Sequence, residues 1–355
     1  MNDRRMRIVA SGDFLHTMGP ETPETMGFGA YRAAAARLAL DFLPSAPQTA
    51  AVPGGAMAGA DTLLMLGQYL RRTDIEAAES LTLVARAGVG VDKIDLDACT
   101  DNGVLVFNAP DALTEGTAAG ALALMLATSR QLVAMDRLTR AGRWDDRVHH
   151  RGREMYGKTL GIVGPGRIGG ELIRLVAPFR MRILAYSPRL TPERAAAKGA
   201  EAVPLDRLMR DSDFVAVCCP LTDETRGLLG ARELALLKPT AFLVNVGRGP
   251  VIDQDALVAA LRARRFAGAG LDVFTVQPVP ADDPITGLDN VVLCPHAVCD
   301  TYELRADVLA STVRDLLAIA DGGLPHAPVN PQVLETPRFR AKRDALVARL
   351  RTPPD

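Results

Sequence analysis

An apolar run that reads LGIVGPGRIGG meets three glycines at the spacing GxGxxG. Gly164 permits a tight turn, Gly166 lets backbone approach a phosphate, and Gly169 lets a helix pack closely on the preceding strand. The N–H groups of Arg167 and Ile168 would then face a phosphate at the N-terminus of that helix. The pattern predicts a strand, a turn and a helix that together bind the pyrophosphate of a dinucleotide.

The next strand-like run, residues 182–186, ends where a dinucleotide site normally offers a carboxylate to the adenosine ribose. Here the run is followed by Ser187, a proline and Arg189. Ser187 has no charge that would repel a 2′-phosphate, and Arg189 can pair with one. We therefore expect NADP as the favoured cofactor, with NAD as the alternative.

The bulk composition excludes several classes of protein. The 355 residues are enough for two domains, and a net charge of −1 gives no general attraction for nucleic acid or an anionic membrane. No run reaches the roughly 20 apolar residues that span a bilayer. The five cysteines are odd in number and lack CxxC spacing, which favours free thiols over disulfides or metal ligands. We expect a cytoplasmic protein without metal, nucleic acid or membrane partners.

Strand-like runs alternate with helix-like runs along most of the chain. This alternation favours α/β domains with parallel sheets. The expected strands are 7–10, 62–66, 81–85, 104–107, 160–163, 182–186, 214–219, 241–246, 270–273 and 291–293. The expected helices are 31–40, 74–80, 113–138 and 302–320. The arginine-rich tail favours a solvated terminal helix over an arm that reaches a neighbouring subunit, and the loop 11–29 is a candidate cover for a substrate.

Two further strand ends carry reactive side chains. Arg248 lies between two glycines after the run AFLVNV, and His296 follows VVLCP. Ligands of open α/β sheets bind beyond the carboxyl ends of the strands, so both side chains are expected near the cofactor. A guanidinium suits a carboxylate or a carbonyl that is being reduced, and an imidazole suits proton delivery to the resulting alkoxide.

Six segments together resemble the D-2-hydroxyacid dehydrogenase family over residues 61–331. They are ARAGVGVDKIDLDA, GKTLGIVGPGRIGG, CCPLTDETRGLLG, FLVNVGRGPVIDQDAL, GAGLDVF and CPHAVCD. The resemblance implies a Rossmann nucleotide-binding domain inserted into a split, flavodoxin-like substrate-binding domain. The expected boundaries are 1–108 plus 297–332 for the substrate domain, 109–296 for the dinucleotide domain, and 333–355 for a C-terminal tail.

The resemblance also implies roles for individual residues. Arg248 would bind the substrate carboxylate and carbonyl, His296 would be the acid/base, and the amides of Val89 and Gly90 would hold the carboxylate. Asp272 would hold the nicotinamide carboxamide. The remaining cofactor contacts implied are Pro220, Thr225, Val246 and Gly247.

One departure from the family concerns the partner of the histidine. Where the family usually has a glutamate, this chain has Gln277. A carboxylate beside an imidazole raises the imidazole pKa and keeps a proton available, whereas a glutamine can only orient the ring. Formate dehydrogenases of the family resemble this arrangement, since formate oxidation needs no proton transfer.

The leading interpretation is an NAD(P)-dependent oxidoreductase that interconverts a small 2-oxoacid and its D-2-hydroxyacid, as a homodimer. The alternatives are a formate-like dehydrogenase that uses Gln277 and His296, and a non-catalytic dinucleotide-sensing protein. Met65 stands where phosphoglycerate dehydrogenases carry a phosphate-binding arginine, which disfavours a phosphorylated substrate. Arg86 is a candidate for binding an acidic group, and an exposed basic residue is the alternative.

Overall fold

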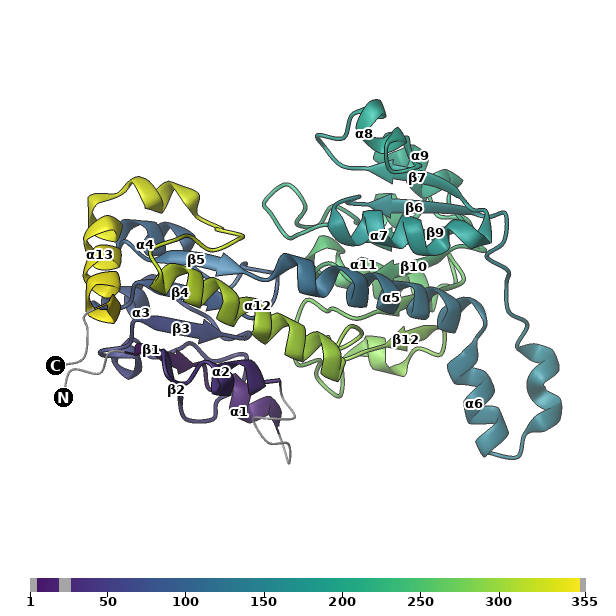
Figure 1. Ribbon diagram of the computed structural model, residues 1–355. Helices are drawn as coiled ribbons and strands as arrows, with labels where there is room; N and C mark the ends of the chain where they lie inside the picture. Colours follow the sequence, from purple (N-terminus) through teal and green to yellow (C-terminus); the bar gives the residue numbers. More distant parts are fainter. Residues whose placement is uncertain (1–4, 19–26, 352–355) are drawn as a thin grey trace. The chain divides into compact units, whose positions relative to one another are not determined.

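The computed structural model describes residues 5–18 and 27–351, and the chain divides into two compact units. Unit 1 comprises residues 1–113 and 300–355, and unit 2 comprises residues 114–299. The sequence of unit 2 therefore interrupts that of unit 1, which can be followed by colour in Figure 1.

Unit 1 is built on a five-stranded parallel sheet with the strand order β2-β1-β3-β4-β5. This is the flavodoxin-like order, in which the chain reverses direction between β1 and β3. The strands are β1 (Met6–Ala10), β2 (Leu38–Phe42), β3 (Thr62–Met65), β4 (Leu83–Arg86) and β5 (Leu105–Asn108). The helical segments are α1 (Asp13–Met18), α2 (Gly29–Ala33), η1 (Gly54–Met57), α3 (Arg72–Glu76), α4 (Leu96–Asp101), α12 (Tyr302–Ala320), η6 (Pro331–Glu335) and α13 (Pro337–Arg351).

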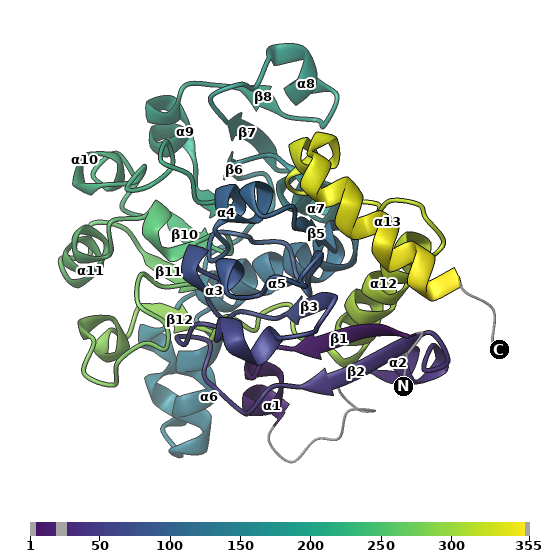
Figure 2. The ribbon, with the colours of Figure 1, turned by 90° about the vertical axis from the view of Figure 1, so that its left-hand side faces the viewer.

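Apolar side chains cover both faces of this sheet, as expected for parallel strands. One face packs against α2, α12 and α13, with Tyr31, Leu316 and Phe339 buried. The other packs against η1, α3 and α4, with Met57 and Ile75 buried. Figure 2 shows unit 1 with α13 beside α12.

Two sequence predictions fail in unit 1. The helix expected at 31–40 ends at Ala33, and Leu38–Phe42 forms strand β2 on the edge of the sheet. Pairing of this segment with β1 outweighs the helix preference of the preceding alanines. The C-terminal segment is helical, but it is not the solvated helix expected: Phe339 and Leu346 are buried in the core, and Arg349 pairs with Asp61.

Unit 2 holds a seven-stranded parallel sheet with the order β12-β11-β10-β9-β6-β7-β8. Counted from β6, this is the doubly wound order of a Rossmann fold, with the chain reversing between β6 and β9. The strands are β6 (Thr159–Val163), β7 (Arg182–Tyr186), β8 (Glu201–Ala202), β9 (Phe214–Val217), β10 (Phe242–Asn245), β11 (Gly268–Leu271) and β12 (Val291–Leu293). The helical segments are α5 (Pro110–Ser129), which begins in unit 1, α6 (Leu132–Arg140), η2 (Trp144–His149), α7 (Arg167–Val176), η3 (Ala177–Phe179), α8 (Pro192–Ala196), α9 (Leu205–Asp211), α10 (Ala231–Leu234), η4 (Gly249–Val251), α11 (Gln254–Arg262) and η5 (Pro284–Gly287).

Two apolar layers sandwich the sheet of unit 2. One contains Met125 of α5 and Leu172 of α7, and the other contains Leu208 of α9 and Leu261 of α11. The α/β fold class expected from the sequence, with a Rossmann unit inserted into a flavodoxin-like unit, is confirmed.

The helix expected over 113–138 is two helices rather than one. It breaks between α5 and α6 at Gln131, whose φ is 52°. Within the described residues no single helix has the length and hydropathy of a membrane span. Among the helices that the structure describes, α5 and α6 pass that test as a pair, and they are bent by 59° at their break.

Candidate active site

The glycine turn lies between β6 and α7, as the motif predicts. Gly164 has φ +88°, and a Cβ there would lie 2.6 Å from the Cβ of Cys219. A Cβ at Gly169 would lie 2.7 Å from the carbonyl oxygen of Gly164, so the helix packs directly on the turn. Gly166 caps α7, and outside its own helix and chain neighbours no described heavy atom lies within 4 Å of the place its Cβ would take. The turn therefore leaves space at the N-terminus of α7, where N–H groups favour an anion.

The segment after β7 forms a tight turn beside this helix N-terminus. The amide of Leu190 donates to the carbonyl of Ser187 at 3.1 Å, and the amide of Gly164 donates to the carbonyl of Tyr186 at 2.8 Å. These bonds bring the end of β7 next to the glycine turn. Arg189 is exposed and makes no hydrogen bond or ion pair within the described residues, so its guanidinium is available to a ligand.

The loop after β9 is held together by a threonine side chain. Thr225 is buried, its hydroxyl donates to the carbonyl of Pro220 at 2.8 Å, and it accepts from the amide of Thr222 at 2.8 Å. Next to this loop, a Cβ at Gly247 would lie 2.6 Å from the carbonyl oxygen of Cys219. Close packing of the loops after β9 and β10 thus requires glycine at 247. Burial raises the pKa of the Cys219 thiol to about 11, so this side chain beside the glycine turn is uncharged at neutral pH.

Arg248 follows β10 in a turn that a buried asparagine holds. Asn245 is 1% exposed, its amide nitrogen donates to the carbonyl of Arg248 at 3.1 Å, and its amide oxygen accepts from Gly247 N at 3.0 Å. Nη1 of Arg248 donates to the carbonyl of Gly247 at 2.9 Å. A Cβ at Gly249 would overlap the backbone of Phe274, so only glycine allows this turn to pack there. Asn245 is a residue that sequence reasoning missed, because its partners are backbone atoms of a turn.

His296 and Gln277 form the pair expected at the next strand ends. Nδ1 of His296 lies 2.8 Å from Oε1 of Gln277, and Nε2 of Gln277 donates to the carbonyl of Phe274 at 3.3 Å. The second bond fixes the orientation of the amide, so its oxygen faces the ring and Nδ1 carries the hydrogen. Nε2 is then the ring atom left to exchange a proton with a substrate. His296 has φ 54°, and its ring is exposed.

Asp272 anchors the backbone of the histidine segment. The side chain is 3% exposed, and its Oδ1 accepts from the amides of Ala297 at 2.9 Å and Val298 at 3.0 Å. Its carbonyl oxygen accepts from the amide of His296 at 2.9 Å. Asp272 therefore holds the His296 turn from both its backbone and its side chain. The sequence assigned it only a cofactor contact, and no local signal marks contacts to residues 25 positions away.

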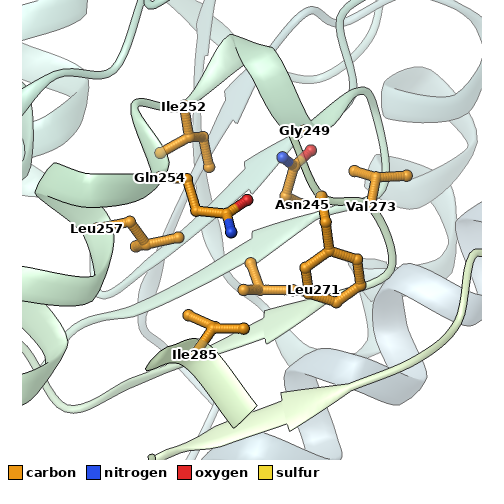
Figure 3. Close-up of a pocket in the computed structure, with 9 residues that line it drawn as sticks. Asn245, Gly249, Ile252, Gln254, Leu257, Leu271, Val273 and Ile285 are labelled. Atoms are coloured by element: carbon orange, nitrogen blue, oxygen red, sulfur yellow. The ribbon is translucent and has the colours of Figure 1, made fainter. Parts of the chain in front are cut away.

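A small cavity lies behind the Arg248 turn and does not belong to the ligand site. It measures about 10 Å³, the room of a single water molecule, and its lining is mostly apolar (Figure 3). Gln254, on its wall, accepts from the amide of Thr275 at 2.9 Å and donates to Asp283 at 2.8 Å. Gln254 thereby ties α11 to the loop that carries Gln277.

The loop 87–90 of unit 1, expected to bind a carboxylate, has an unusual pattern of backbone bonds. The carbonyl of Gly88 accepts from the amide of Ala109 at 3.1 Å, and that of Val89 accepts from the side chain of Asn108 at 2.8 Å. In a trans peptide the N–H points opposite to the C=O, so the amides of Val89 and Gly90 point away from the end of β5. Within the described part of unit 1, neither amide donates a hydrogen bond. Two adjacent N–H groups with free hydrogens form a nest for an anion.

Arg248, Asp272 and His296 follow three adjacent strands, β10, β11 and β12, at the carboxyl edge of the unit 2 sheet. The glycine turn follows β6 at the same edge. Among the described residues, no group of three or more His, Cys, Asp or Glu side chains could hold a metal ion. This edge thus combines a phosphate-binding turn, a guanidinium and an imidazole on one sheet.

Comparison with known proteins decides the family. The D-isomer specific 2-hydroxyacid dehydrogenase NAD-binding domain family matches residues 122–298. A glyoxylate reductase of Korarchaeum cryptofilum is 44% identical over 73% of this chain and 79% of that protein. The chain belongs to the D-isomer specific 2-hydroxyacid dehydrogenases. A glyoxylate reductase of Pyrococcus furiosus is 42% identical over 76% of this chain and 82% of that protein.

Solved structures of this dehydrogenase family agree with the fold. The NADPH-dependent glyoxylate/hydroxypyruvate reductase of Sinorhizobium meliloti, solved with NADP and malonate, has a TM-score of 0.77 and 30% identity. The match covers 92% of this chain and 98% of that one. The protein is an NAD(P)-dependent dehydrogenase that interconverts 2-oxoacids and 2-hydroxyacids, with a Rossmann domain that binds the nicotinamide cofactor.

Proposed function

We propose that this dehydrogenase reduces glyoxylate and hydroxypyruvate to glycolate and D-glycerate, with NADPH as its preferred cofactor. The observation that carries the proposal is the placement of Arg248, Gln277 and His296 after β10, β11 and β12, on the edge that also bears the glycine turn. The names of the relatives and of the Sinorhizobium meliloti reductase supply the substrate class. The proposal assigns substrate binding to residues 1–108 plus 297–332 and cofactor binding to residues 109–296, and α13, expected in a separate tail at 333–355, packs into the core of unit 1.

The proposed reaction gives each protein group a defined role. The amides of Val89 and Gly90 bind the substrate carboxylate. Arg248 binds the carboxylate and polarises the C2 carbonyl, since a planar guanidinium can bridge both oxygens. His296 delivers a proton from Nε2 to the carbonyl oxygen as C2 is reduced. When bound, the nicotinamide cofactor supplies the hydride, and the product is the 2-hydroxyacid.

The residues of unit 2 suit a nicotinamide dinucleotide. The open space at Gly166 and the first amides of α7, from Arg167, Ile168 and Gly169, suit a pyrophosphate. Val246 and Gly247 line the edge beside it, together with the Pro220 and Thr225 loop. Asp272 would accept from the carboxamide of the nicotinamide through the oxygen that does not hold the His296 turn.

The preference for NADPH follows from the end of β7. Ser187 brings no negative charge, and Arg189 lies exposed in the same turn without a partner in the described residues. A guanidinium and a phosphate form a charge-assisted pair that NADH cannot make. The NADPH and NADP complexes of two structural neighbours support the choice.

The test is a panel of substrates with purified enzyme. Nicotinamide absorbance is followed with glyoxylate, hydroxypyruvate, larger 2-oxoacids and formate, each with both cofactors. The proposal expects turnover of glyoxylate and hydroxypyruvate, with kcat/KM for NADPH above that for NADH. Turnover restricted to large 2-oxoacids, or a preference for NADH, would contradict it.

The Gln277–His296 pair also supports a second candidate, oxidation of formate. An imidazole held by an uncharged amide suits a substrate that loses only a hydride, because no proton has to be delivered. Formate, assayed with NADP+ and NAD+, is therefore the substrate of the panel that distinguishes this candidate from reduction of a 2-oxoacid. The non-catalytic alternative, a dinucleotide-sensing protein, expects cofactor binding without turnover of any acid.

We propose that the enzyme is a homodimer joined through unit 2. The segment formed by α6 and η2 extends from the unit 2 sheet (Figure 1) and carries exposed apolar side chains. Leu132 is 61% exposed, Trp144 64% and Val148 56%. Light scattering should give the mass of a dimer, and Trp144→Asp should shift it towards a monomer. We place the enzyme in the cytoplasm because all five cysteines are free.

A further inference from the structure

Arg86, at the end of β4, has a side chain that turns back into the loop that follows it. Its Nε donates to the carbonyl of Gly90 at 2.9 Å, and its Nη1 donates to the carbonyl of Ala87. A Cβ on Gly88, whose φ is +152°, would overlap this guanidinium. The guanidinium thus lies inside the turn formed by residues 87–90.

With the bonds from Ala109 and Asn108 included, every carbonyl oxygen of residues 87–90 accepts a hydrogen bond. The carbonyls of Ala87 and Gly90 face Arg86, and those of Gly88 and Val89 face the end of β5. The orientation of each peptide plane in the loop is therefore fixed by a hydrogen-bond donor of unit 1. The bonds from Ala109 and Asn108 turn the amides of Val89 and Gly90 outward, and the bonds from Arg86 hold the two peptides on either side of them, whose N–H groups belong to Gly88 and Val91.

The charge of Arg86 also acts on a buried carboxyl group, that of Asp13. Asp13 is fully buried after β1, and it accepts from the hydroxyl of Ser11 and the amide of Gly67, both at 2.6 Å. Burial raises the pKa of Asp13, and the charge of Arg86 opposes that rise.

We propose that Arg86 is a positioning residue: by holding the peptides on either side of the carboxylate-binding amides of Val89 and Gly90, it keeps these amides in place without itself binding the substrate. This inference rests on the proposed function, because it takes those amides as the carboxylate site. A planar guanidinium can reach two carbonyls in fixed directions from one stem. The ammonium of a lysine keeps the charge but cannot donate to two carbonyls in these fixed directions, so lysine should not replace Arg86.

The test compares Arg86→Gln and Arg86→Lys with Asn108→Ala, which removes the neutral donor to the same loop. Each variant is assayed with glyoxylate, hydroxypyruvate and oxaloacetate. The dissociation constants of NADPH and of oxalate are measured separately by fluorescence and calorimetry. Arg72→Gln, which removes an exposed arginine of the same unit, is the matched control. Melting curves identify any variant that fails to fold.

The expected result is a KM about 10- to 100-fold higher for all three oxoacids, with kcat nearly unchanged. The carboxylate is bound equally before and during hydride transfer, so its loss acts on KM. Oxalate should weaken in parallel, NADPH should not, and Asn108→Ala should behave like Arg86→Gln.

Three results would overturn the inference. An unchanged KM in both Arg86 variants would show that the loop keeps its shape alone. A higher KM for oxaloacetate only would make Arg86 a ligand of a distal carboxylate. Full recovery with Arg86→Lys would make the charge, and not the fork, the active property. A wild-type enzyme without activity on any of the three acids would instead refute the proposed function.

Discussion

Nδ1 of His296 lies 2.8 Å from Oε1 of Gln277, and the other end of that amide donates to a backbone carbonyl. The contact orients the ring and fixes its tautomer, but it adds no negative charge to stabilise an imidazolium. The first prediction follows from that missing charge.

Gln277→Glu should raise the pKa of His296, because a carboxylate beside the ring favours its charged form. Reduction needs the protonated ring, so activity is lost as pH rises through this pKa. The alkaline limb of kcat/KM for glyoxylate should therefore move upward by about 1 pH unit or more. Gln332→Glu, which adds the same charge in unit 1, is the control. An unmoved limb would mean that His296 does not supply the proton.

Arg248→Gln should abolish most reduction while leaving the cofactor in place. The variant loses the guanidinium that polarises the carbonyl, and the expected fall in kcat/KM is about 100- to 1000-fold. NADPH affinity, measured by fluorescence, should stay within about twofold. Arg226→Gln, which alters an exposed arginine of the same unit, should behave as wild type. A loss of NADPH binding equal to the loss of rate would place Arg248 at the cofactor instead.

Asp272→Ala should loosen the His296 turn, because the amides of Ala297 and Val298 lose their acceptor. Leaving two partly buried donors without their acceptor costs up to about 1–3 kcal/mol each, so urea should unfold the variant at a lower concentration. The rate should fall as well, since the ring is no longer held. Asp272→Asn keeps one carbonyl oxygen and should recover part of both. An unchanged kcat in Asp272→Ala would show that the reaction does not depend on the hydrogen bonds by which Asp272 holds the His296 turn.

Lys342 on α13 should make the stability of the protein depend on pH. Its ammonium donates to the carbonyls of Leu81 and Asn102, yet burial lowers its pKa to about 8 from 10.5, with a further lowering from Arg338. Between these two values the unfolded chain holds a proton that the folded chain has released. Stability therefore rises with pH across that window.

The comparison with Lys342→Met isolates this effect from other titrating groups. The free energy of unfolding of wild type minus that of the variant should increase by up to about 2 kcal/mol between pH 8 and pH 10. Urea titrations at several pH values measure it, with Lys198→Met as a control for the loss of a lysine. A constant or falling difference would refute the prediction.

Arg189→Ala should weaken NADPH but not NADH. Loss of a charge-assisted pair with the 2′-phosphate predicts a KM for NADPH about 10- to 100-fold higher. Arg180→Ala, on the turn before β7, should change neither cofactor. Equal changes in the KM for NADPH and for NADH would show that Arg189 does not bind the 2′-phosphate.

Local motifs made much of the site predictable. The turn at Gly164, the guanidinium of Arg248 and the imidazole of His296 each follow an apolar run, and parallel strands bring their carboxyl ends to one edge. The parts that escaped prediction depend on distant contacts. Asp272 reaches amides 25 residues away, and Arg86 folds back on its own loop.

The difference between local motifs and distant contacts also explains the errors in the predicted fold. The segment after Ala33 becomes a strand only because β1 offers an edge to pair with. Gln131 breaks the long helix in a left-handed conformation, with neither glycine nor proline to signal it. Phe339 on α13 is buried by the sheet of unit 1, although the arginines around it resemble a solvated helix.

The central claim is that hydride passes to C2 of a 2-oxoacid to give the D-hydroxyacid, and one labelling measurement tests it most directly. Hydroxypyruvate is reduced with NADPH that carries two deuterium atoms at C4 of the nicotinamide, and the product is resolved by chiral chromatography and mass spectrometry. The account predicts D-glycerate with one deuterium at C2. L-glycerate, unlabelled glycerate, or no reduction beside rapid oxidation of formate would contradict it.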